Sequence, residues 1–497
     1  MKKINFLFLV FIIIFLYSCS FEKQRNKFSQ NENITNIYRE KLKIKSSIIK
    51  NSNIGIEVFL LKFSPKHKNH WLPEDAISRE SFPIYSFLES EKKPVISNNK
   101  NENTFNNWYR SHGNHSANRF SELKLINKDN VKNLEVAWIY NSGKAQDIQC
   151  NPIVVKGVIY TPIGDNRIAA INGYNGKIIW KSKKFKSVLA KRGLIYWEDP
   201  NSDKKMIFFS SGKNLVSLNA RDGSFQSDFG SNGVVRTGVN LLPPVIYKNQ
   251  IVIATLSPDH NIESHNVLTG KLEWKLNYKK KNSKRVGGVP YDNSKGNPWG
   301  GSSLDINRGI FYIATGNPNS YFNGTRRPGV NEDTDSIIAI DLNKKKKIWS
   351  FQETRHDIWN LDLPSPPILT SMKKDNRLID VVVNPTKSGN TLILDRLTGK
   401  PIYEFRLKKT KPSKILGERT SVYQPDLKTP EPFEKVFFKK SNMRKQFING
   451  IFKKNIHEFG WYKAPQLNTY HVRGGITGGA EWTGASVDHK KHIMYVT

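Results

Sequence analysis

Residues 354–364 bring together acidic and histidine side chains that could do chemistry. The segment reads TRHDIWNLDLP and contains His356, Asp357 and Asp362. A carboxylate beside a bound metal ion can remove the proton of a hydroxyl group, as the oxidation of an alcohol requires. An isolated His-Asp pair is more often structural, so the assignment depends on the whole segment. His356, Asp357 and Asp362 are therefore candidates for such a proton transfer.

Arg192, Lys387 and Asn317 are further side chains that could bind a charged ligand or a metal ion. Arg192 lies in the segment KRGLIYW, Lys387 in NPTKSG and Asn317 in ATGNPNS. A planar guanidinium pairs with a carboxylate through two parallel hydrogen bonds, and a cationic donor stabilises negative charge that develops on oxygen. Amide and carboxylate oxygens are ligands that calcium prefers. Taken alone, each of these residues could equally have a purely structural role.

The elements that must position these residues are predicted to be β-strands. From about residue 105 onward, short β-branched runs such as NPIVVKGVIYTP and NQIVIATL are bounded by Gly, Asn and Asp, and helical periodicity is almost absent. This pattern predicts an all-β fold. Residues 19–105 are rich in Lys, Asn, Ser and Glu, and we interpret them as a tether or a small N-terminal extension.

Five similar segments repeat along the β region. Their shared positions are an Asn or Asp (Asn172, Asn219, Asn266, Asp341, Asp395), a glycine four residues later (Gly176, Gly223, Gly270, Gly399) and an aromatic residue eight residues later (Trp180, Trp274, Trp349, Tyr403). Lys345 and Ser227 interrupt the glycine and aromatic columns. An Asx turn, a glycine with positive φ and an aromatic ring packed between sheets would explain the pattern. Repeats of this length predict four-stranded propeller blades, with insertions where a site should lie.

The repeats, together with the opening stretch of residues 106–143, resemble the tryptophan-docking motifs of eight-bladed propellers of the pyrroloquinoline quinone (PQQ) dehydrogenase type. Four other motifs carry the resemblance: residues 191–197, similar to RGxxYW; residues 296–305 with 314–320; residues 354–364, similar to HHDxWDxDLP; and residues 384–389, similar to PTKxG. The resemblance spans residues 106–497. It implies an incomplete eight-bladed propeller, of which about five to six blades are present.

The resemblance also implies roles for individual residues. The residues that would contact PQQ are Arg192, Trp299, Thr315, Lys387 and Trp482, the last within the segment GGAEW. The residues that would hold calcium are Asn317 and Asp357, with Asp259 as the acidic candidate near a shortened loop. Asp357 would be the general base, Lys387 would hold the quinone oxygens, and His356 and Asp362 would have structural roles. Two positions depart from the family: Ala190 and its neighbours stand where adjacent cysteines often lie, and Gln149 stands where many relatives have glutamate.

The function implied by the resemblance is a PQQ- and calcium-dependent dehydrogenase. It would oxidise the CH-OH group of a sugar or an alcohol and pass electrons to a respiratory quinone or a cytochrome. Two alternatives stay open. One is a non-catalytic propeller lipoprotein that acts as a scaffold in outer-membrane protein assembly, and the other is an inactive truncated relic.

Residues 1–18 have the features of an export signal. Two lysines precede an apolar run that is shorter than the roughly 20 residues a membrane span needs, although a membrane-spanning anchor is the alternative. The sequence LYSC ending at Cys19 resembles the bacterial lipobox, in which the cysteine is acylated. We therefore expect a protein of the bacterial periplasm that is lipid-anchored to a membrane surface through Cys19.

Composition excludes several other classes of protein. The two cysteines, Cys19 and Cys150, cannot build a disulfide framework, a cysteine zinc site or an iron-sulfur cluster. The net charge is +35, from 78 Lys and Arg against 43 Asp and Glu. Because the lysines are spread along an exported chain rich in Asn and Ile, we do not expect a nucleic-acid partner, whereas attraction to anionic lipid is compatible with the charge.

Overall fold

The structure is a computed structural model. It describes residues 107–142, 149–187, 189–279, 285–286, 289–290, 296–327, 329–413, 415, 418, 420–426, 462, 464 and 480–496. The predicted signal peptide, Cys19 and the predicted tether lie outside these residues. Apart from one 3-10 turn, η1 (Val131–Asn133), the regular elements described are β-strands. No described helix is long and apolar enough to cross a membrane.

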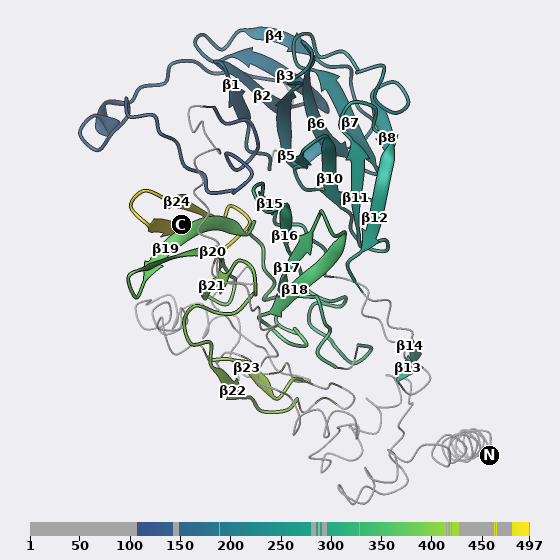
Figure 1. Ribbon diagram of the computed structural model, residues 1–497, viewed down its shortest axis with the longest axis vertical. Helices are drawn as coiled ribbons and strands as arrows, with labels where there is room; N and C mark the ends of the chain where they lie inside the picture. Colours follow the sequence, from purple (N-terminus) through teal and green to yellow (C-terminus); the bar gives the residue numbers. More distant parts are fainter. Residues whose placement is uncertain are drawn as a thin grey trace, which may run out of the picture.

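Successive antiparallel sheets form the body of the molecule (Figure 1). The first contains β1 (Ile153–Val155), β2 (Val158–Ile163), β3 (Arg167–Asn172) and β4 (Ile178–Lys181). The second contains β5 (Leu189–Glu198), β6 (Lys205–Ser211), β7 (Asn214–Asn219) and β8 (Val234–Arg236). The third contains β9 (Val245–Tyr247), β10 (Gln250–Ala254), β11 (Asn261–Asn266) and β12 (Leu272–Asn277). The fourth contains β15 (Ser302–Asp305), β16 (Ile310–Ala314), β17 (Ser336–Asp341) and β18 (Lys346–Gln352).

A fifth sheet and the first hairpin of another complete the series. The fifth sheet has three strands, β19 (Ile368–Lys374), β20 (Arg377–Pro385) and β21 (Thr391–Asp395). The hairpin is β24 (Ala485–Asp488) with β25 (Ile493–Val496), and β24 contacts β19. Two further strand pairs are β13 (Arg285–Val286) with β14 (Val289–Pro290) and β22 (Leu407–Lys409) with β23 (Tyr423–Pro425). The prediction of an all-β propeller with about five to six blades is confirmed among the described residues.

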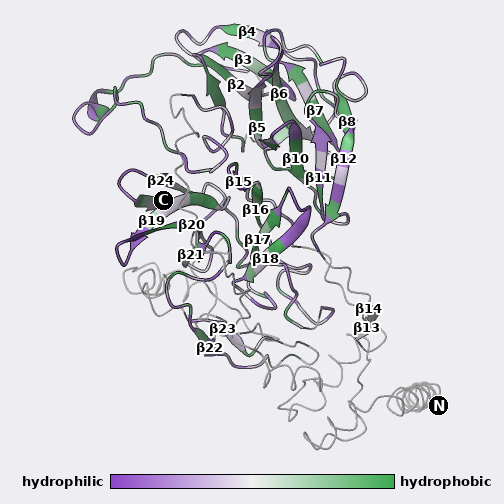
Figure 2. Cartoon of the chain, in the orientation of Figure 1, coloured by the Kyte–Doolittle hydropathy of each residue, from purple (hydrophilic) through white to green (hydrophobic). Residues whose placement is uncertain are grey.

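The hydrophobic core lies in layers between neighbouring sheets. One layer joins the first and second sheets, and others join the second to the third, the third to the fourth and the fourth to the fifth. Strands inside the stack are therefore apolar on both faces, as in the run Ile337–Ile340 of β17, whose residues are all fully buried. Figure 2 shows β10 and β16 as mainly hydrophobic and the outer strand β18 as partly hydrophilic.

The repeat positions behave as predicted at most turns. The side-chain oxygens of all five Asx residues accept backbone N–H groups two or three residues ahead. The Trp180 ring lies against Gly223 of the next sheet, and its Nε1 donates to the carbonyl oxygen of Ala220 at 3.0 Å. Trp349 packs against Gly399 in the same way. Each tryptophan thus docks onto the turn of the following blade.

Two repeats depart from this docking. The turn that follows the Trp274 sheet has Lys345, with φ of 53°, where the other turns have glycine. Trp274 Nε1 donates instead to Gln250 Oε1 of its own sheet, at 3.3 Å. Tyr403 is 55% exposed, and the Lys374 ammonium lies 5.0 Å from its ring centroid. The expectation that Tyr403 packs between sheets is therefore wrong, because its ring faces solvent at the edge of the fifth sheet.

Residues 108–118 join the first strands of the sheets in sequence. Backbone hydrogen bonds connect this segment to Val154 in β1, to Leu194 in β5, to Leu304 in β15, to Leu369 in β19 and to Val487 in β24. The Arg110 guanidinium, which is fully buried, donates to Pro243 O and Pro244 O at 2.9 Å and to Ser302 O at 3.0 Å. We call this segment the hub, because it holds consecutive blades in register.

Candidate cofactor and cation site

The candidate site lies where strand ends of the fourth and fifth sheets share one rim. β16 and β18 run in the same direction, because they are two strands apart in an antiparallel sheet, and β20 is the equivalent of β16 in the next sheet. The segments that follow these strands carry Asn317, Asp357 and Lys387, respectively. The sheet order therefore brings together residues that are far apart in sequence.

A cavity of about 300 Å³ opens at this rim. It is lined by Leu256, Asn297, Trp299, Gly316, Asn317, Tyr321, Asn360, Asp362 and Lys387. Three of the predicted site residues, Trp299, Asn317 and Lys387, contribute to this lining. The lining combines apolar and aromatic side chains with amide, carboxylate and ammonium groups, as expected for a cavity that orients a small ligand.

Two cationic side chains converge on the Trp299 ring. The Arg192 guanidinium carbon lies 5.0 Å from the centroid of that ring, and Lys387 Nζ lies 5.5 Å from it. Arg192 also lies 4.7 Å from the ring centroid of Trp482. These distances are within the range of cation–π attraction. The structure thus brings together four of the five residues predicted to contact the cofactor.

The backbone of β5 explains how Arg192 reaches this position. The register between β5 and β6 shifts between Leu189 and Leu194, which leaves Arg192 in a bulge. Gly193 in the bulge has φ of 152°, and a side chain there would collide with Ser111 of the hub. A bulge re-aims side chains relative to a regular strand, so this irregularity turns Arg192 toward Trp299.

Asp362 fixes both Lys387 and Trp299. Lys387 Nζ donates to Asp362 Oδ1 at 2.5 Å, and Trp299 Nε1 donates to Asp362 Oδ2 at 2.6 Å. Burial raises the pKa of the Asp362 carboxyl above its ordinary value, and the Lys387 charge offsets only part of this increase. The prediction that Asp362 is structural therefore understated its position, since it orients two residues of the cavity.

Asp357 and Asn317 are in direct contact. Asn317 Nδ2 donates to Asp357 Oδ2, and the backbone N–H groups of Trp359 and Leu361 donate to the same carboxylate at 2.7 and 2.8 Å. Asp357 is fully buried and Asn317 nearly so. Three donors thus hold the predicted base in one orientation beside the predicted amide ligand.

His356 points away from this contact and into the protein. Its Nε2 lies 2.6 Å from Glu418 Oε1, and its Nδ1 lies 2.8 Å from the carbonyl oxygen of Gly329. Burial alone would raise the pKa of Glu418, but the hydrogen bond and charge of His356 lower it below its ordinary value. These contacts agree with the structural role expected for His356.

Thr315 and Asp259 lie outside the lining of the cavity. The Thr315 hydroxyl donates to Asp333 O at 2.9 Å and accepts from the Ser336 N–H at 3.0 Å, so it is used within the loop. Asp259 is half-buried, and its carbonyl oxygen accepts from Asn277. Among the described residues, no group of three or more His, Cys, Asp or Glu side chains is arranged around a metal position.

Sequence analysis overlooked two buried carboxylates at the same rim. Asp335 directly precedes β17, and Glu353 directly follows β18. Glu353 Oε1 accepts from Ser388 Oγ at 2.6 Å and from Asn390 Nδ2 at 2.7 Å, which ties the end of β18 to the loop that carries Lys387. The available signal was an acidic residue at the end of an apolar strand, on the side where the catalytic motifs lie.

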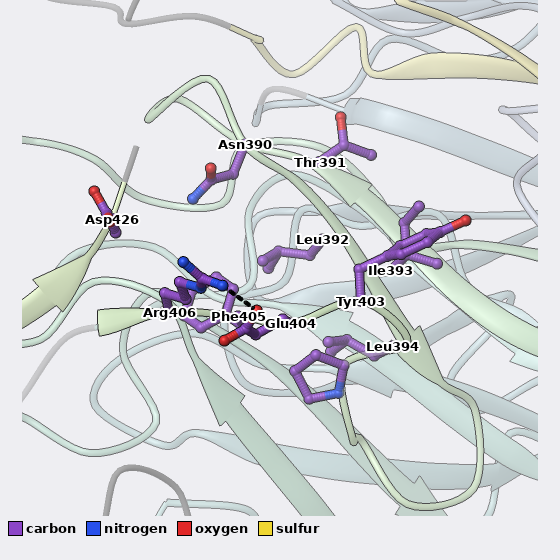
Figure 3. Close-up of a pocket in the computed structure, with 11 residues that line it drawn as sticks. Asn390, Thr391, Leu392, Ile393, Leu394, Tyr403, Glu404, Phe405, Arg406 and Asp426 are labelled. Carbon is purple, nitrogen blue, oxygen red and sulfur yellow. Dashed lines mark hydrogen bonds and ion pairs between the residues drawn. The ribbon is translucent and has the colours of Figure 1, made fainter. Parts of the chain in front are cut away.

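A second cavity, of about 600 Å³, lies beside β21 and the segment of residues 401–406 (Figure 3). It is lined by Asn390, Thr391, Leu392, Ile393, Leu394, Pro401, Tyr403, Glu404, Phe405, Arg406 and Asp426. The paired Arg406 and Glu404 side chains lie in it, 2.6 Å apart and largely exposed. None of the predicted site residues contributes to this cavity.

Two solved structures with a similar fold are dehydrogenases. A quinohemoprotein alcohol dehydrogenase from Pseudomonas putida HK5 aligns with a TM-score of 0.57 and 20% identity, over 79% of this chain and 57% of that chain. A europium-containing methanol dehydrogenase aligns with a TM-score of 0.57 and 19% identity, over 78% of this chain and 68% of that chain. These similarities show the propeller fold.

Two curated proteins with similar sequences are also dehydrogenases. Quinoprotein glucose dehydrogenase A from Acinetobacter calcoaceticus is 28% identical over 439 residues, which cover 76% of this chain and 55% of the relative. The glycerol dehydrogenase large subunit from Gluconobacter thailandicus is 25% identical over 429 residues, covering 76% of this chain and 58% of the relative. The chain spans between half and three fifths of the length of these relatives.

A protein-family model matches nearly all of the β region of this chain. This family is the PQQ glucose/ethanol/alcohol dehydrogenase β-propeller domain, and its match extends over residues 108–497. The matched range includes every sheet described above and every candidate residue of the site. Because the match covers well over half of the sequence, the chain belongs to the glucose/ethanol/alcohol dehydrogenase family of PQQ β-propeller proteins.

Proposed function

We propose that this chain binds PQQ and a calcium ion and oxidises the CH-OH group of a sugar or an alcohol. The observation that carries the proposal is the convergence of Arg192 and Lys387 on the Trp299 ring, next to the Asn317–Asp357 contact. An aromatic platform with two cations suits a flat acidic ligand, and an amide beside a carboxylate suits a hard cation.

The residues present fit PQQ, a planar tricarboxylate. Trp299 offers a flat apolar face, Arg192 can pair with a carboxylate of the ligand, and Lys387 can donate to a quinone oxygen. Trp482 limits the movement of the Arg192 guanidinium by stacking on it. When bound, PQQ supplies the two-electron acceptor that alcohol oxidation requires. The protein would supply the charges of Arg192 and Lys387 that hold PQQ and the Trp299 ring that orients it.

Asp357 is the residue we assign to the proton of the substrate hydroxyl. Its carboxylate already accepts three hydrogen bonds, which fix its orientation. Calcium held by Asn317 and Asp357 would supply Lewis acidity at this position. The identity of the sugar or alcohol depends on the shape of the cavity near Tyr321 and Asn360, which line its wall.

The remaining parts of the proposal concern location and electron transfer. Acylation of Cys19 would anchor the chain to a membrane surface in the bacterial periplasm. Electrons would then pass to a respiratory quinone or to a cytochrome. The sequence resemblance also implies a calcium contact for Asp259 and a PQQ contact for Thr315, but neither residue lines the cavity, so the proposal does not depend on them.

The test is reconstitution of the full chain with PQQ and calcium chloride. We expect quinone absorbance to stay with the protein through gel filtration, and we expect a redox dye to be reduced in the presence of some members of an aldose and alcohol panel. Failure to retain PQQ at any calcium concentration would contradict the proposal and favour the scaffold alternative. Retained PQQ without dye reduction on any substrate would favour the inactive relic.

A further inference from the structure

Asp335 is a buried carboxylate whose oxygens lack hydrogen-bond partners. Its side chain is fully buried, and neither Oδ1 nor Oδ2 accepts a hydrogen bond from the described residues. The nearby Thr334 hydroxyl donates to the carbonyl oxygen of Asn331 at 2.7 Å. Burial of a carboxylate without partners is destabilising, so its presence requires an explanation.

The backbone places Asp335 between the two segments that form the candidate cation site. The Asp335 N–H donates to Gly316 O at 3.1 Å, directly before Asn317, and the Glu353 N–H donates to Asp335 O at 3.0 Å. Asp335 therefore lies at the rim where β16 and β18 end. The segment that carries Asn317 lies on one side of it, and the segment that leads to Asp357 lies on the other.

The charges around Asp335 are mostly negative. Burial raises the pKa of its carboxyl well above the ordinary value, and the charges of Asp357 and Asp362 raise it further. The neighbouring Thr334 hydroxyl and the charge of Arg327 offset part of this increase in pKa. The Arg327 guanidinium itself donates to Asn331 Oδ1 and to backbone oxygens, including that of Asp357, and Lys387 forms its ion pair with Asp362. Two carboxylates, those of Asp357 and Asp362, thus act on Asp335 against one guanidinium.

We propose that Asp335 is the acidic ligand that completes the cation site of Asn317 and Asp357. The proposal rests on the function proposed above, because it assumes that a cation binds at this position. It assigns to Asp335 the role for which the sequence suggested Asp259. Two carboxylates and one amide then face the ion, and the attraction of the ion for the carboxylates compensates the burial of Asp335.

The test compares Asp335→Asn with the wild-type full chain. We expect calcium affinity, measured by isothermal titration calorimetry without PQQ, to fall about tenfold or more, because ligand charge tunes calcium binding. We also expect calcium to raise the unfolding temperature of wild type more than that of the variant, because only wild type offers the Asp335 carboxylate to the ion. A residue that only supported the fold would lower the unfolding temperature equally with and without calcium, and would leave the calcium affinity unchanged.

Asp380→Asn is the matched control, and Asp259→Asn tests the competing ligand that the sequence resemblance implies. Asp380 is a buried carboxylate of the neighbouring sheet that already has partners, Arg308 at 2.6 Å and Ser371 at 2.6 Å. Its substitution should lower the unfolding temperature and leave calcium affinity unchanged. Substitution of Asp259 should change neither the calcium affinity nor the calcium-induced rise in unfolding temperature.

The outcomes separate this inference from the proposed function. If wild type binds no calcium, both are overturned. If wild type binds calcium and Asp335→Asn binds it equally well, only the role of Asp335 is overturned. The same conclusion follows if Asp259→Asn alone loses affinity. Should Asp335→Asn not fold, Asp335→Ser, which also removes the charge and is smaller, is measured in the same way.

Discussion

Asp357 and Lys387 lie at the same rim, but their substitution should affect PQQ retention and turnover differently. Asp357 touches Asn317 and would act on the substrate proton, whereas Lys387 neutralises Asp362 beside Trp299. One residue is thus assigned to the reaction and the other to both the cofactor and the local electrostatics.

We expect Asp357→Asn to retain PQQ and to lower turnover by about 10²- to 10⁴-fold, because an amide cannot accept the hydroxyl proton. Lys387→Ala should weaken PQQ retention as well as turnover, since it removes a charge that pairs with the quinone. PQQ titration and steady-state dye reduction measure the two effects. Lys344→Ala, at an exposed position, is the control for loss of a lysine. Unchanged turnover of PQQ-loaded Asp357→Asn would refute the assignment of the base.

Glu353 gives the site a pH-dependent stability. Burial raises the pKa of its carboxyl to about 7 from 4.5; hydrogen bonds from Ser388, Asn390 and Thr386 oppose this increase and the charge of Asp357 adds to it. Between these values the folded state binds more protons than the unfolded chain. Stability therefore falls as the pH rises through this range.

The corresponding prediction concerns Glu353→Gln in the absence of calcium. The glutamine keeps a carbonyl oxygen that can accept from Ser388 and Asn390, but it carries no charge. We expect the unfolding temperature of wild type to decrease from about pH 5 to about pH 7, the pKa range of this carboxyl, and that of the variant to decrease less. Circular dichroism melts at several pH values measure this slope. Equal slopes for the two proteins would show that Glu353 does not titrate in this range.

At the level of elements, the docking of a tryptophan onto a glycine turn connects each blade to the next. The Trp180 ring occupies the space that a side chain on Gly223 would need, and Gly223 has φ of 74°. Gly157 has a similar φ of 77°, but nothing lies within 4 Å of the position of its absent Cβ. The two glycines differ mainly in this contact.

We therefore expect Gly223→Ala to be more destabilising than Gly157→Ala. The strain of positive φ should cost about 1 kcal/mol in both variants, and displacement of the tryptophan should add about 1–3 kcal/mol in Gly223→Ala alone. Chemical denaturation monitored by tryptophan fluorescence gives both free energies of unfolding. If the two variants lose equal stability, the ring contact does not hold the blades together.

At the level of the whole molecule, the hub decides how the blades are arranged. The segment bonds to the first strands of consecutive sheets, and the Arg110 guanidinium joins the third sheet to the fourth through backbone oxygens. These bonds satisfy backbone groups at the inner edges of the sheets, where a strand would otherwise be unpaired. The hub also approaches Gly193, so it helps to form the bulge that carries Arg192.

The sequence by itself determined the repeating elements. An Asx residue and a glycine encode a turn locally, and β-branched runs encode strands, so the blades and most of their turns follow from short-range pattern. The motifs around Asn317, Asp357 and Lys387 were likewise visible, because each lies in a short segment of unusual composition. Tyr403 was misjudged because the pattern does not say whether a following blade covers the ring.

Only the tertiary structure decided which charges meet. The ion pair of Lys387 with Asp362, the stacking of Arg192 on two tryptophans and the orphaned oxygens of Asp335 all depend on strand ends that meet at one rim. Sequence spacing does not encode these contacts, since they join different sheets. Burial is the physical reason that they matter, because a carboxylate that is unremarkable in water becomes costly without a cation when it is enclosed by the fold.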